Sequence, residues 1–527
     1  MKYKGNSMKN ENYDLIIIGG GATGSGIAVD AASRGLKTLL LEKNDFSEGT
    51  SSRSTKLVHG GVRYLEKAVK HLDINQFNLV KEGLKERSRL LKNAPHLCSR
   101  LTLVTPLYKW WEIPYMLAGL TLYDLVSGTK GLGRSSVVSK SKMIENFPVI
   151  KKEGLAGGVK YYDGTFNDSR LTISLLQTAK EYGATCKNYH EVMAFTYNDE
   201  KKVTGVEVLD KINNKIETIK AKSIVNAAGV FADRVNKLDE KYAKNMLDLS
   251  TGIHIILDKK YLPSKEGLMI PKTEDGRVLF ILPWLGKCLV GTTDDPAKLK
   301  THPEVTDKDI EYILRHLEIY FDIKVKKDEI LSSWCGLRPL IAPDEDDDTS
   351  NIVREHEIRT NNSGLIAIIG GKWTTYRKMA EQLVDHVIKV QKEDKKECIT
   401  KKLKLVGSKN LDEKFVSSKV DEKTNAYLLS QYGDRIEKVL TSVDKIEYFV
   451  EGKPYTNTEL IYTIKEEFVK KPMDYLARRC NVALIDKKLA FDILEKVVNI
   501  MKIELAWDEE KALEEKDEAF ELLESNI

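Results

Sequence analysis

Hydroxyl, histidine and cationic side chains are concentrated in one short segment, Ser51–Glu66. Adjacent hydroxyl and backbone N–H groups can bind phosphate oxygens or the polar edge of a flavin ring. Arg63 in the same segment can hold an anion through a forked pair of hydrogen bonds. A solvated basic loop is the alternative interpretation. The density of hydroxyls, glycines and cations favours a site for a cofactor or an anionic substrate.

A run of glycines near the N-terminus carries a second pattern. Gly19, Gly21 and Gly24 follow an apolar run, and Glu42 ends the next apolar run. The first glycine permits a tight turn, the second lets N–H groups approach a pyrophosphate, and the third lets helix and strand pack closely. Glu42 would accept hydrogen bonds from an adenosine ribose. The spacing predicts a strand, a glycine turn, a helix and a second strand that together bind a dinucleotide.

Glycines alone are a weak signal, since a turn can need flexible residues for other reasons. Here the strands, the helix and the terminal acid all occur at the expected spacing, which favours nucleotide binding. Ser223–Gly229 predicts a buried strand whose small last residues let backbone lie against a ligand, although tight structural packing is a competing reason. Gly364–Lys372 repeats the pattern of strand and glycines, so the chain is expected to return there to the nucleotide domain.

Length and composition limit the class of protein. The chain has 527 residues, of which 42% are hydrophobic and 31% charged, and its formal net charge is +4. This length predicts two or three domains, and the balance is typical of a soluble globular protein. The small net charge gives no reason to expect nucleic-acid binding.

The remaining sequence predicts further elements. Val69–Leu91 reads as one helical block, and 154–270 mixes a helix with short alternating strands. Turn signals between about 250 and 345 predict a second, antiparallel sheet. Beyond about residue 400 the chain is rich in Lys, Glu and Leu, which predicts a separate helical domain. One of its helices begins with a capping box formed by Thr456 and Glu459.

Several features argue against other classes. The six cysteines include no Cys-x-x-Cys pair, so reduced thiols are expected. The acidic run Asp344–Asp348 lacks the glycine turn of a calcium loop, and no metal is predicted. Met1–Asn12 lacks the apolar core of a secretory signal, so a cytoplasmic location is expected. The aromatic segment Trp110–Tyr123 is too short to span a membrane and suits either a membrane interface or a buried helix.

The chain resembles the FAD-dependent glycerol-3-phosphate dehydrogenases over nearly its whole length. Besides the glycine run, it carries the family's motifs in the family's order: Ser54–Glu66, Tyr161–Gly164, Pro283–Gly286, Gly291–Asp294, Gly336–Leu340, Arg354–His356, Gly370–Arg377 and Tyr475–Arg479.

The resemblance implies an α/β fold with three parts. These are a Rossmann-like FAD-binding domain of the glutathione-reductase or D-amino-acid-oxidase type, an antiparallel-sheet substrate domain and a C-terminal helical domain. The first two interleave within 1–400 and the helical domain covers 401–527. The FAD parts are expected at about 10–105, 155–250 and 350–400, and the substrate parts at about 106–154 and 251–349.

The implied reaction is oxidation of sn-glycerol 3-phosphate to dihydroxyacetone phosphate, with a hydride passing from C2 to N5 of non-covalent FAD. Electrons then pass to a membrane quinone. The resemblance also implies peripheral contact with the inner face of the cell membrane, and it leaves a homodimer open.

Site residues follow from matching positions. The substrate is assigned Arg63, Arg338, Arg354 and Lys372 as cations, with Tyr64 and Thr375 as hydrogen-bonding partners; Arg338, stiffened by Pro339, is also assigned to catalysis. The cofactor is assigned Gly19, Gly21, Gly24, Glu42, Thr50, Ser51, Ser52, Lys56, Leu57, His59, Gly229, Gly371 and Lys372.

His254 matches a histidine that the family places near the flavin and is the candidate base, since a neutral imidazole suits proton abstraction near pH 7. Family members often have serine before that histidine, whereas Ile253 stands here. His59 is an alternative base, and an arginine-bound water or the substrate phosphate is a third.

Three other functions agree less well with the sequence. A glycerol-3-phosphate oxidase would use the same pocket and pass electrons to oxygen, but the chain has no obvious inserted segment of the kind that lengthens soluble oxidases. An amine or amino-acid oxidase would need a carboxylate clamp and leaves most motifs unexplained. A flavin-binding interaction protein with an inactive pocket predicts loss of the cations, which are all present.

Overall fold

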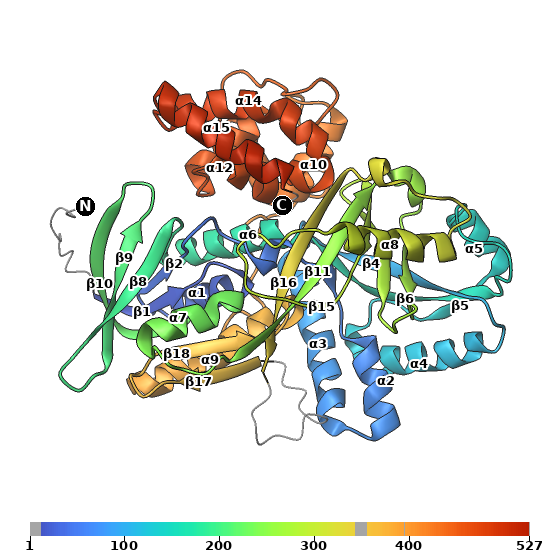
Figure 1. Cartoon of the computed structure of the whole chain (residues 1–527), viewed down its shortest axis with the longest axis horizontal. Helices are drawn as coiled ribbons and strands as arrows, with labels where there is room; N and C mark the ends of the chain where they lie inside the picture. Colours follow the sequence, from blue (N-terminus) through green and yellow to red (C-terminus); the bar gives the residue numbers. More distant parts are fainter. Residues whose placement is uncertain (1–11, 343–355, 395, 526–527) are drawn as a thin grey trace.

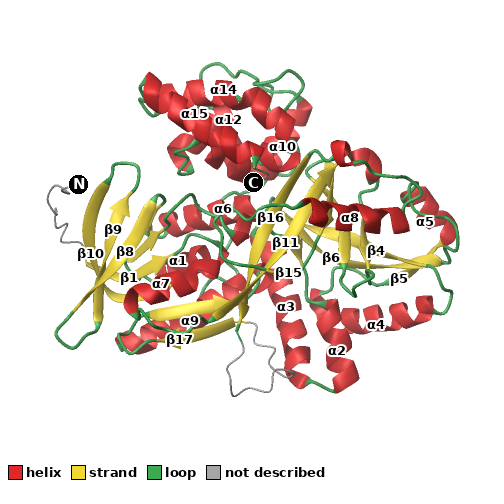
Figure 2. Cartoon of the chain, viewed as in Figure 1, coloured by secondary structure: helices red, strands yellow, loops and turns green. Residues whose placement is uncertain are grey.

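The computed structural model describes residues 12–342, 356–394 and 396–525. Within these ranges two β-sheets lie side by side, each with helices packed against it (Figure 1). The last part of the chain is helical and lies above both sheets in Figure 2. The α/β class with a C-terminal helical part is therefore confirmed.

The first sheet carries the glycine turn. Its central strands β18, β10, β1, β2 and β7 pair in parallel in that order, and β17 pairs antiparallel at one edge. Parallel strands place their carboxyl ends at one edge, where ligands bind in such sheets. The strands are β1 (Asn12–Ile18), β2 (Thr38–Leu41), β7 (Thr185–Lys187), β8 (His190–Tyr197), β9 (Val203–Asp210), β10 (Lys215–Asn226), β17 (His356–Thr360) and β18 (Ile366–Gly370).

The second sheet is mostly antiparallel and forms the wall of a separate core. Its strands are β3 (Leu57–Val58), β4 (Cys98–Leu107), β5 (Ser136–Ser139), β6 (Gly157–Phe166), β11 (Leu247–Leu257), β12 (Gly267–Ile270), β13 (Leu279–Trp284), β14 (Lys287–Gly291), β15 (Asp295–Pro296) and β16 (Ser332–Ile341). The division expected from the sequence differs here: most of β4 and all of β6 were placed with the FAD parts, but both pair within this second sheet. Their partners lie far away in sequence, so local pattern could not assign them.

Helices cover both sheets. They are α1 (Ala22–Ser33), α2 (Val62–His71), α3 (Ile74–Asn93), α4 (Glu112–Ser127), α5 (Lys140–Asn146), α6 (Asp168–Glu181), α7 (Ala232–Asp239), α8 (Asp307–Tyr320) and α9 (Tyr376–Gln391). The single block expected over Val69–Leu91 is wrong, because α2 and α3 form a hairpin. Leu72 has a left-handed φ of 52°, and the Asp73 side chain accepts hydrogen bonds from the N–H groups of Asn75 and Gln76. Asp73 is an N-cap, which starts a new helix.

The C-terminal helices are α10 (Glu422–Tyr432), α11 (Ile436–Leu440), α12 (Asn457–Glu466), α13 (Val482–Ile485), α14 (Lys487–Glu504) and α15 (Glu509–Glu524), with a π-helix at Asp474–Arg479. Thr456 caps α12 as expected, accepting from the Glu459 N–H at 3.5 Å. A capping box also requires the Glu459 side chain to accept from the Thr456 N–H, and this part of the prediction is wrong. The Glu459 carboxylate instead accepts hydroxyl hydrogen bonds from Tyr427, Tyr432 and Tyr475 at 2.8, 2.9 and 2.9 Å.

Glu459 makes the stability of this domain depend on pH. The carboxyl is fully buried, and burial raises its pKa to about 7 although the three tyrosine hydroxyls lower it. Because the folded pKa lies above that of the unfolded chain, the folded state favours the protonated carboxyl. The free energy of unfolding should therefore fall as pH rises from about 4.5 to about 7, by on the order of 3 kcal/mol in total.

We expect Glu459→Gln to remove most of this pH dependence, since the amide stays neutral. Thermal unfolding of both proteins at pH 5 and pH 8 tests this: the Tm of the variant relative to the original chain should rise between the two pH values. An equal difference in Tm at both pH values would show that the carboxyl does not titrate in this range.

Candidate functional site

Six of the thirteen residues assigned to the cofactor line one cleft at the carboxyl end of β1, called here the nucleotide cleft. Of the predicted positions, its lining includes Gly19, Gly21, Glu42, Thr50, Ser51 and Gly229. Lys43, Phe231 and Thr301 were not predicted but also line it. The lining comes from segments far apart in sequence, which the parallel sheet brings to one edge.

The glycine turn is shaped by close backbone approaches. Gly19 has φ +112°, and a Cβ on it would lie 2.6 Å from the Ala227 carbonyl oxygen. A Cβ on Gly24 would lie 1.9 Å from the Gly19 carbonyl oxygen, so neither position accepts a side chain. Gly21 begins α1 without a capping side-chain hydrogen bond and lines the nucleotide cleft. The Ala22 N–H at this helix start donates to the Ser51 hydroxyl at 2.9 Å. Backbone N–H and hydroxyl groups at a helix N-terminus suit a pyrophosphate, so these residues fit a dinucleotide such as FAD.

Glu42 joins the turn to the end of β2. Its carboxylate accepts hydrogen bonds from the N–H groups of Gly20 at 2.7 Å and Asn44 at 3.0 Å. Burial raises the pKa of Glu42, and these two hydrogen bonds only partly offset that effect. Each carboxylate oxygen keeps a lone pair for a ribose hydroxyl. Glu42 can therefore fix the turn and still bind a nucleotide.

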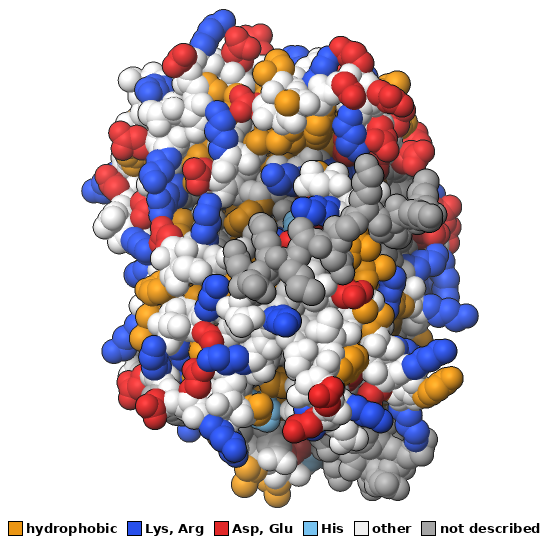
Figure 3. Space-filling model, turned by 90° about the vertical axis from the view of Figure 1, so that its left-hand side faces the viewer, with side chains coloured by type: hydrophobic (Ala, Val, Ile, Leu, Met, Phe, Trp, Pro, Cys, Tyr) orange, Lys and Arg blue, Asp and Glu red, His pale blue; other side chains and the backbone are white. Residues whose placement is uncertain are grey.

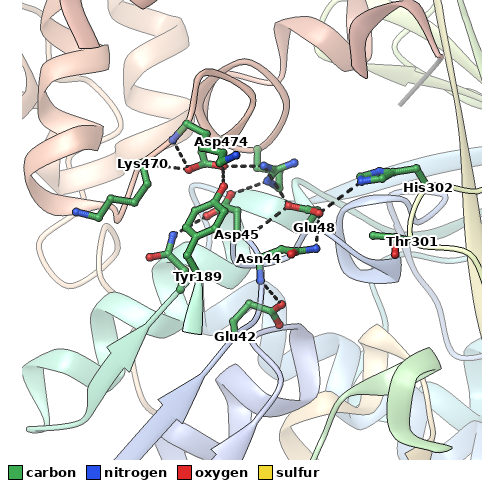
Figure 4. Close-up of polar contacts among 12 residues, drawn as sticks. Glu42, Asn44, Asp45, Glu48, Tyr189, Thr301, His302, Lys470 and Asp474 are labelled. Atoms are coloured by element: carbon green, nitrogen blue, oxygen red, sulfur yellow. Dashed lines mark hydrogen bonds and ion pairs between the residues drawn. The ribbon is translucent and has the colours of Figure 1, made fainter. Parts of the chain in front are cut away.

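The loop after Glu42 is held by neighbours from other parts of the chain (Figure 4). The Asn44 side-chain amide donates to Glu48 at 2.8 Å, and His302 Nε2 lies 3.8 Å from the same Glu48 oxygen. Thr301, beside His302, lines the nucleotide cleft. A loop connected to the second sheet thus closes one side of the cleft.

Lys56 does not line the nucleotide cleft, contrary to its assignment to the cofactor. It is fully buried, with Nζ 2.7 Å from an Asp168 carboxylate oxygen and 2.6 Å from the Ser52 carbonyl oxygen that accepts its hydrogen bond. Burial lowers the pKa of Lys56, and the Asp168 charge offsets this only in part. The ammonium fixes the Ser51–Glu66 segment from within. Gly24, Ser52 and Gly371 are likewise not among the residues that line the nucleotide cleft.

A second cavity of about 360 Å³ contains the predicted Leu57, His59, Tyr64 and Arg338. The unpredicted part of its lining includes Asp163, Arg277, Phe280, Thr292 and Asp294. Both the segment after β3 and the end of β16 contribute, so this second cavity lies where the Ser51–Glu66 segment meets the antiparallel sheet.

Arg338 presents its guanidinium on the wall of the second cavity. Nη1 donates to the Thr251 carbonyl and to Asp294, both at 2.9 Å, and Nη2 donates to the Thr292 hydroxyl and the Thr293 carbonyl, both at 3.0 Å. Its side chain is 32% exposed and that of Asp294 is 59% exposed. The position of the guanidinium is therefore fixed, and among the described residues the exposed carboxylate of Asp294 is the one group that competes for it with an incoming anion.

Lys372 reaches the second cavity from the first sheet. Its Nζ lies 4.1 Å from the centre of the Tyr64 ring, which lines that cavity. The adjacent Trp373 donates from Nε1 to the Ser51 carbonyl at 2.9 Å. Thr375 is buried, and its hydroxyl donates to the Lys372 carbonyl at 3.3 Å, within the same turn. The segments Ser51–Glu66 and Gly370–Arg377 are thus in contact beside both the nucleotide cleft, at Ser51, and the second cavity, at Tyr64.

His254 is buried and is not among the residues that line the second cavity, but it lies against Gly291, which precedes the lining residue Thr292. Its Nε2 lies 2.9 Å from the Thr55 hydroxyl, and its ring stacks on Trp334 at 5.2 Å between centres. Nδ1 has no hydrogen-bond partner among the described residues. Burial lowers the pKa of His254 well below 6.5, and the charges of Arg338 and Lys56 lower it further. The imidazole is thus neutral and keeps one buried nitrogen for a ligand.

Three further predicted site residues are the alternative base His59 and the cations Arg63 and Arg354. His59 lines the second cavity, and burial lowers its pKa, although Asp163 opposes that shift. Arg63 lies in α2, and Arg354 falls outside the described residues.

Sequence reasoning gave no role to Arg277, Asp163 or Asp294. Arg277 is paired with Asp295 at 3.0 Å, and no motif singled it out. Asp163 and Asp294 do belong to the recognised motifs Tyr161–Gly164 and Gly291–Asp294, so the signal was present without a function attached to it.

Other site types find little support in the described ranges. They contain no group of three His, Cys, Asp or Glu side chains that could hold a metal ion, and the acidic run 344–348 lies outside them. No helix there is long and apolar enough to cross a bilayer. On the face drawn in Figure 3, Lys and Arg are interspersed with Asp and Glu rather than gathered in one basic field.

Known proteins resemble the chain in both its parts. Residues 14–377 match the family described as FAD dependent oxidoreductase, and 398–512 match the C-terminal domain of alpha-glycerophosphate oxidase. A mitochondrial glycerol-3-phosphate dehydrogenase of Arabidopsis thaliana is 41% identical over 98% of this chain and 86% of its own. The corresponding Bos taurus protein is 40% identical over 98% of this chain and 74% of its own.

Two solved structures are also similar to the chain. Glycerol-3-phosphate dehydrogenase from Bacillus halodurans, complexed with FAD, has a TM-score of 0.79 and 31% identity, covering 98% of this chain and 96% of that one. L-alpha-glycerophosphate oxidase from Mycoplasma pneumoniae has a TM-score of 0.57 and 16% identity, covering 74% of this chain and 98% of that one, which shows a shared fold alone.

Proposed function

Because the chain belongs to the family of FAD-dependent glycerol-3-phosphate dehydrogenases, we propose that it oxidises sn-glycerol 3-phosphate to dihydroxyacetone phosphate and passes the electrons to a membrane quinone. When bound, FAD, the cofactor of the family, would supply the hydride acceptor, and the residues of the nucleotide cleft would hold it. The chain must then supply a phosphate site, a base and a fixed geometry.

The observation that carries this proposal is the placement of two cations beside one cavity: Arg338 lines it together with Tyr64, and Lys372 lies over the Tyr64 ring. Arg338 comes from β16 of the second sheet, and Lys372 follows β18 of the first. Two cations from different sheets beside one cavity favour a dianionic phosphate as ligand. Arg63 and Arg354 are proposed as further cations, and Tyr64 and Thr375 as hydrogen-bonding partners.

His254 is proposed to remove the C2 hydroxyl proton. Its neutral imidazole has an unpartnered Nδ1, and its other nitrogen is fixed by Thr55. His59 stays the alternative base, since it lines the second cavity with Arg338.

Anaerobic mixing with sn-glycerol 3-phosphate tests the reaction and its acceptor. The flavin absorbance of the holoenzyme should bleach, and addition of a short-chain ubiquinone should restore it faster than oxygen does. Bleaching with rapid recovery in oxygen and formation of hydrogen peroxide would establish the oxidase alternative. Absence of bleaching would contradict the substrate.

Quinones dissolve in membranes, so the proposal requires a membrane contact. The α2–α3 hairpin and the start of α4 expose large apolar side chains: Leu72 is 89% exposed, Ile74 73% and Trp110 77%. The Tyr115 hydroxyl donates to Glu66 at 3.3 Å and joins α4 to α2. This apolar tip lies at the end of the molecule opposite the C-terminal helices (Figure 1). Aromatic and aliphatic side chains of this kind favour an interfacial contact with lipid.

We expect the double variant Leu72→Asp, Ile74→Asp to bind anionic phospholipid vesicles at least about tenfold more weakly, because each side chain loses apolar burial in the lipid. Co-sedimentation with vesicles measures the binding. Activity with a soluble dye acceptor should stay unchanged.

Val416→Asp, Ile503→Asp is the matched control, since these side chains are 77% and 79% exposed on the C-terminal part. Equal loss of vesicle binding in both double variants would remove the apolar tip as the lipid contact. The location at the inner face of the cell membrane is likewise a proposal, as the curated relatives named above are mitochondrial.

A further inference from the structure

We propose that the C-terminal helical part belongs to the FAD site: Arg478 and Arg479 hold Asp45, and through it they position the loop 42–48 that carries Glu42. The loop lies between the glycine turn on one side and the C-terminal part on the other (Figure 4). Both arginines act through Asp45 and are positioning residues.

The inner side of the loop fixes the glycine turn. Besides the bond between Glu42 and the Gly20 N–H, the Ser47 N–H donates to the Gly20 carbonyl at 3.0 Å. A Cβ on Gly20 would lie 2.4 Å from the Phe46 ring, so this ring presses directly against the turn. Any shift of the loop 42–48 therefore moves the groups proposed to bind ribose and pyrophosphate.

The outer side of the loop is bound by the C-terminal part. Arg478 Nε donates to Asp45 at 2.5 Å, and Arg479 donates to it from Nη1 at 2.8 Å and Nη2 at 2.9 Å. Arg478 also lies 3.6 Å from Glu48. The Phe46 ring meets the Phe468 ring edge-on, 5.1 Å between centres. Three side chains of this seven-residue loop, those of Asp45, Phe46 and Glu48, thus contact the C-terminal part.

The two arginines are themselves fixed. Arg479 donates to the Glu467 carbonyl at 3.0 and 2.8 Å, and Arg478 donates to Asp474 at 2.9 Å. Asp474 in turn accepts from the Tyr189 hydroxyl at 2.7 Å (Figure 4). Asp45 and Arg479 are both fully buried. A buried charge that loses its partner is strongly destabilised, so Asp45 cannot keep this position without the arginines.

This arrangement couples FAD binding to docking of the C-terminal part, and such coupling is reciprocal. Loss of the arginine contacts should weaken FAD, and FAD should strengthen docking. The inference rests on the family's FAD alone and not on the substrate or the acceptor. Its failure would leave the proposed oxidation intact, and failure of the oxidation would leave this coupling testable.

The experiment measures the Kd of FAD for full-length Arg479→Gln and Asp45→Asn proteins by flavin fluorescence. We expect a Kd about tenfold to a hundredfold higher than that of the original chain. The activity per bound flavin and the KM for glycerol 3-phosphate should stay unchanged. Arg479→Lys keeps the charge without the forked geometry and should give an intermediate Kd. If Arg479→Gln fails to fold, the Kd of FAD for Arg479→Lys is measured in its place.

Glu467→Gln is the matched control. Its carboxylate forms a buried ion pair with Arg170 of α6, which ties the C-terminal part to the same domain. The variant changes only this carboxylate and keeps the backbone carbonyl to which Arg479 donates. It should lower the Tm while the Kd of FAD stays within about threefold. FAD should also slow proteolysis of the connection between α9 and α10 in the original chain, but less in Arg479→Lys. Equal increases in Kd for Glu467→Gln and Arg479→Lys, or an unchanged Kd in Asp45→Asn, would overturn the proposal.

Discussion

Replacing Arg338 with alanine is expected to lower kcat/KM for sn-glycerol 3-phosphate by about a thousandfold, or about 4 kcal/mol, while FAD stays bound. The size follows from the fixed guanidinium. Four hydrogen bonds to Thr251, Thr292, Thr293 and Asp294 hold it on the wall of the second cavity before any substrate arrives. A preorganised cation adds to binding without the entropy cost of ordering its side chain.

Steady-state rates with a soluble dye acceptor give kcat and KM, and the visible spectrum reports bound flavin. Arg338→Lys should recover only part of the activity, since an ammonium cannot reproduce the planar fork. Asp294→Asn is the companion variant. It keeps the guanidinium and removes the carboxylate 2.9 Å away, so KM should stay equal or fall. A normal kcat/KM in Arg338→Ala would show that the phosphate is held elsewhere.

The glycine turn could be predicted from the sequence because its determinants are local. The strand, the three glycines, the helix and the acid are all determined by residues close together in the chain. The φ of 112° at Gly19 is a conformation that favours glycine. The N-cap at Asp73, which divides α2 from α3, was an equally local signal. A sequence reading that tests each Asp as a helix start would have found the hairpin.

Residues whose partners lie far away could not be assigned in this way. Lys56 lies in a segment rich in hydroxyl groups, which made a binding role plausible. The fold shows instead that its ammonium forms a buried ion pair with Asp168 of α6. The same limit applies to β4, because the pattern of a strand does not reveal which sheet it joins. Asp45 belongs to none of the motifs singled out in the sequence, and its buried partner Arg479 is 434 residues away.

Replacing His254 with glutamine is expected to slow reduction of bound FAD by glycerol 3-phosphate about a hundredfold to ten-thousandfold, the usual contribution of a general base. Substrate binding should change much less. The imidazole is held in place from several directions. Thr55 contacts Nε2, Trp334 stacks on the ring, and a Cβ on Gly291 would lie 2.2 Å from its Cδ2. Within the described part of the chain Nδ1 has no partner, which leaves this nitrogen to receive a proton.

Stopped-flow reduction under anaerobic conditions separates this step from reoxidation. Because burial and the charges of Arg338 and Lys56 hold the pKa of His254 well below 6.5, the imidazole is already deprotonated at pH 6. The reduction rate should therefore show no inflection from this group between pH 6 and pH 8. His59→Gln is the discriminating comparison, since burial lowers the pKa of His59 as well and it lines the second cavity. Slow reduction in His59→Gln with a normal rate in His254→Gln would transfer the role of base to His59.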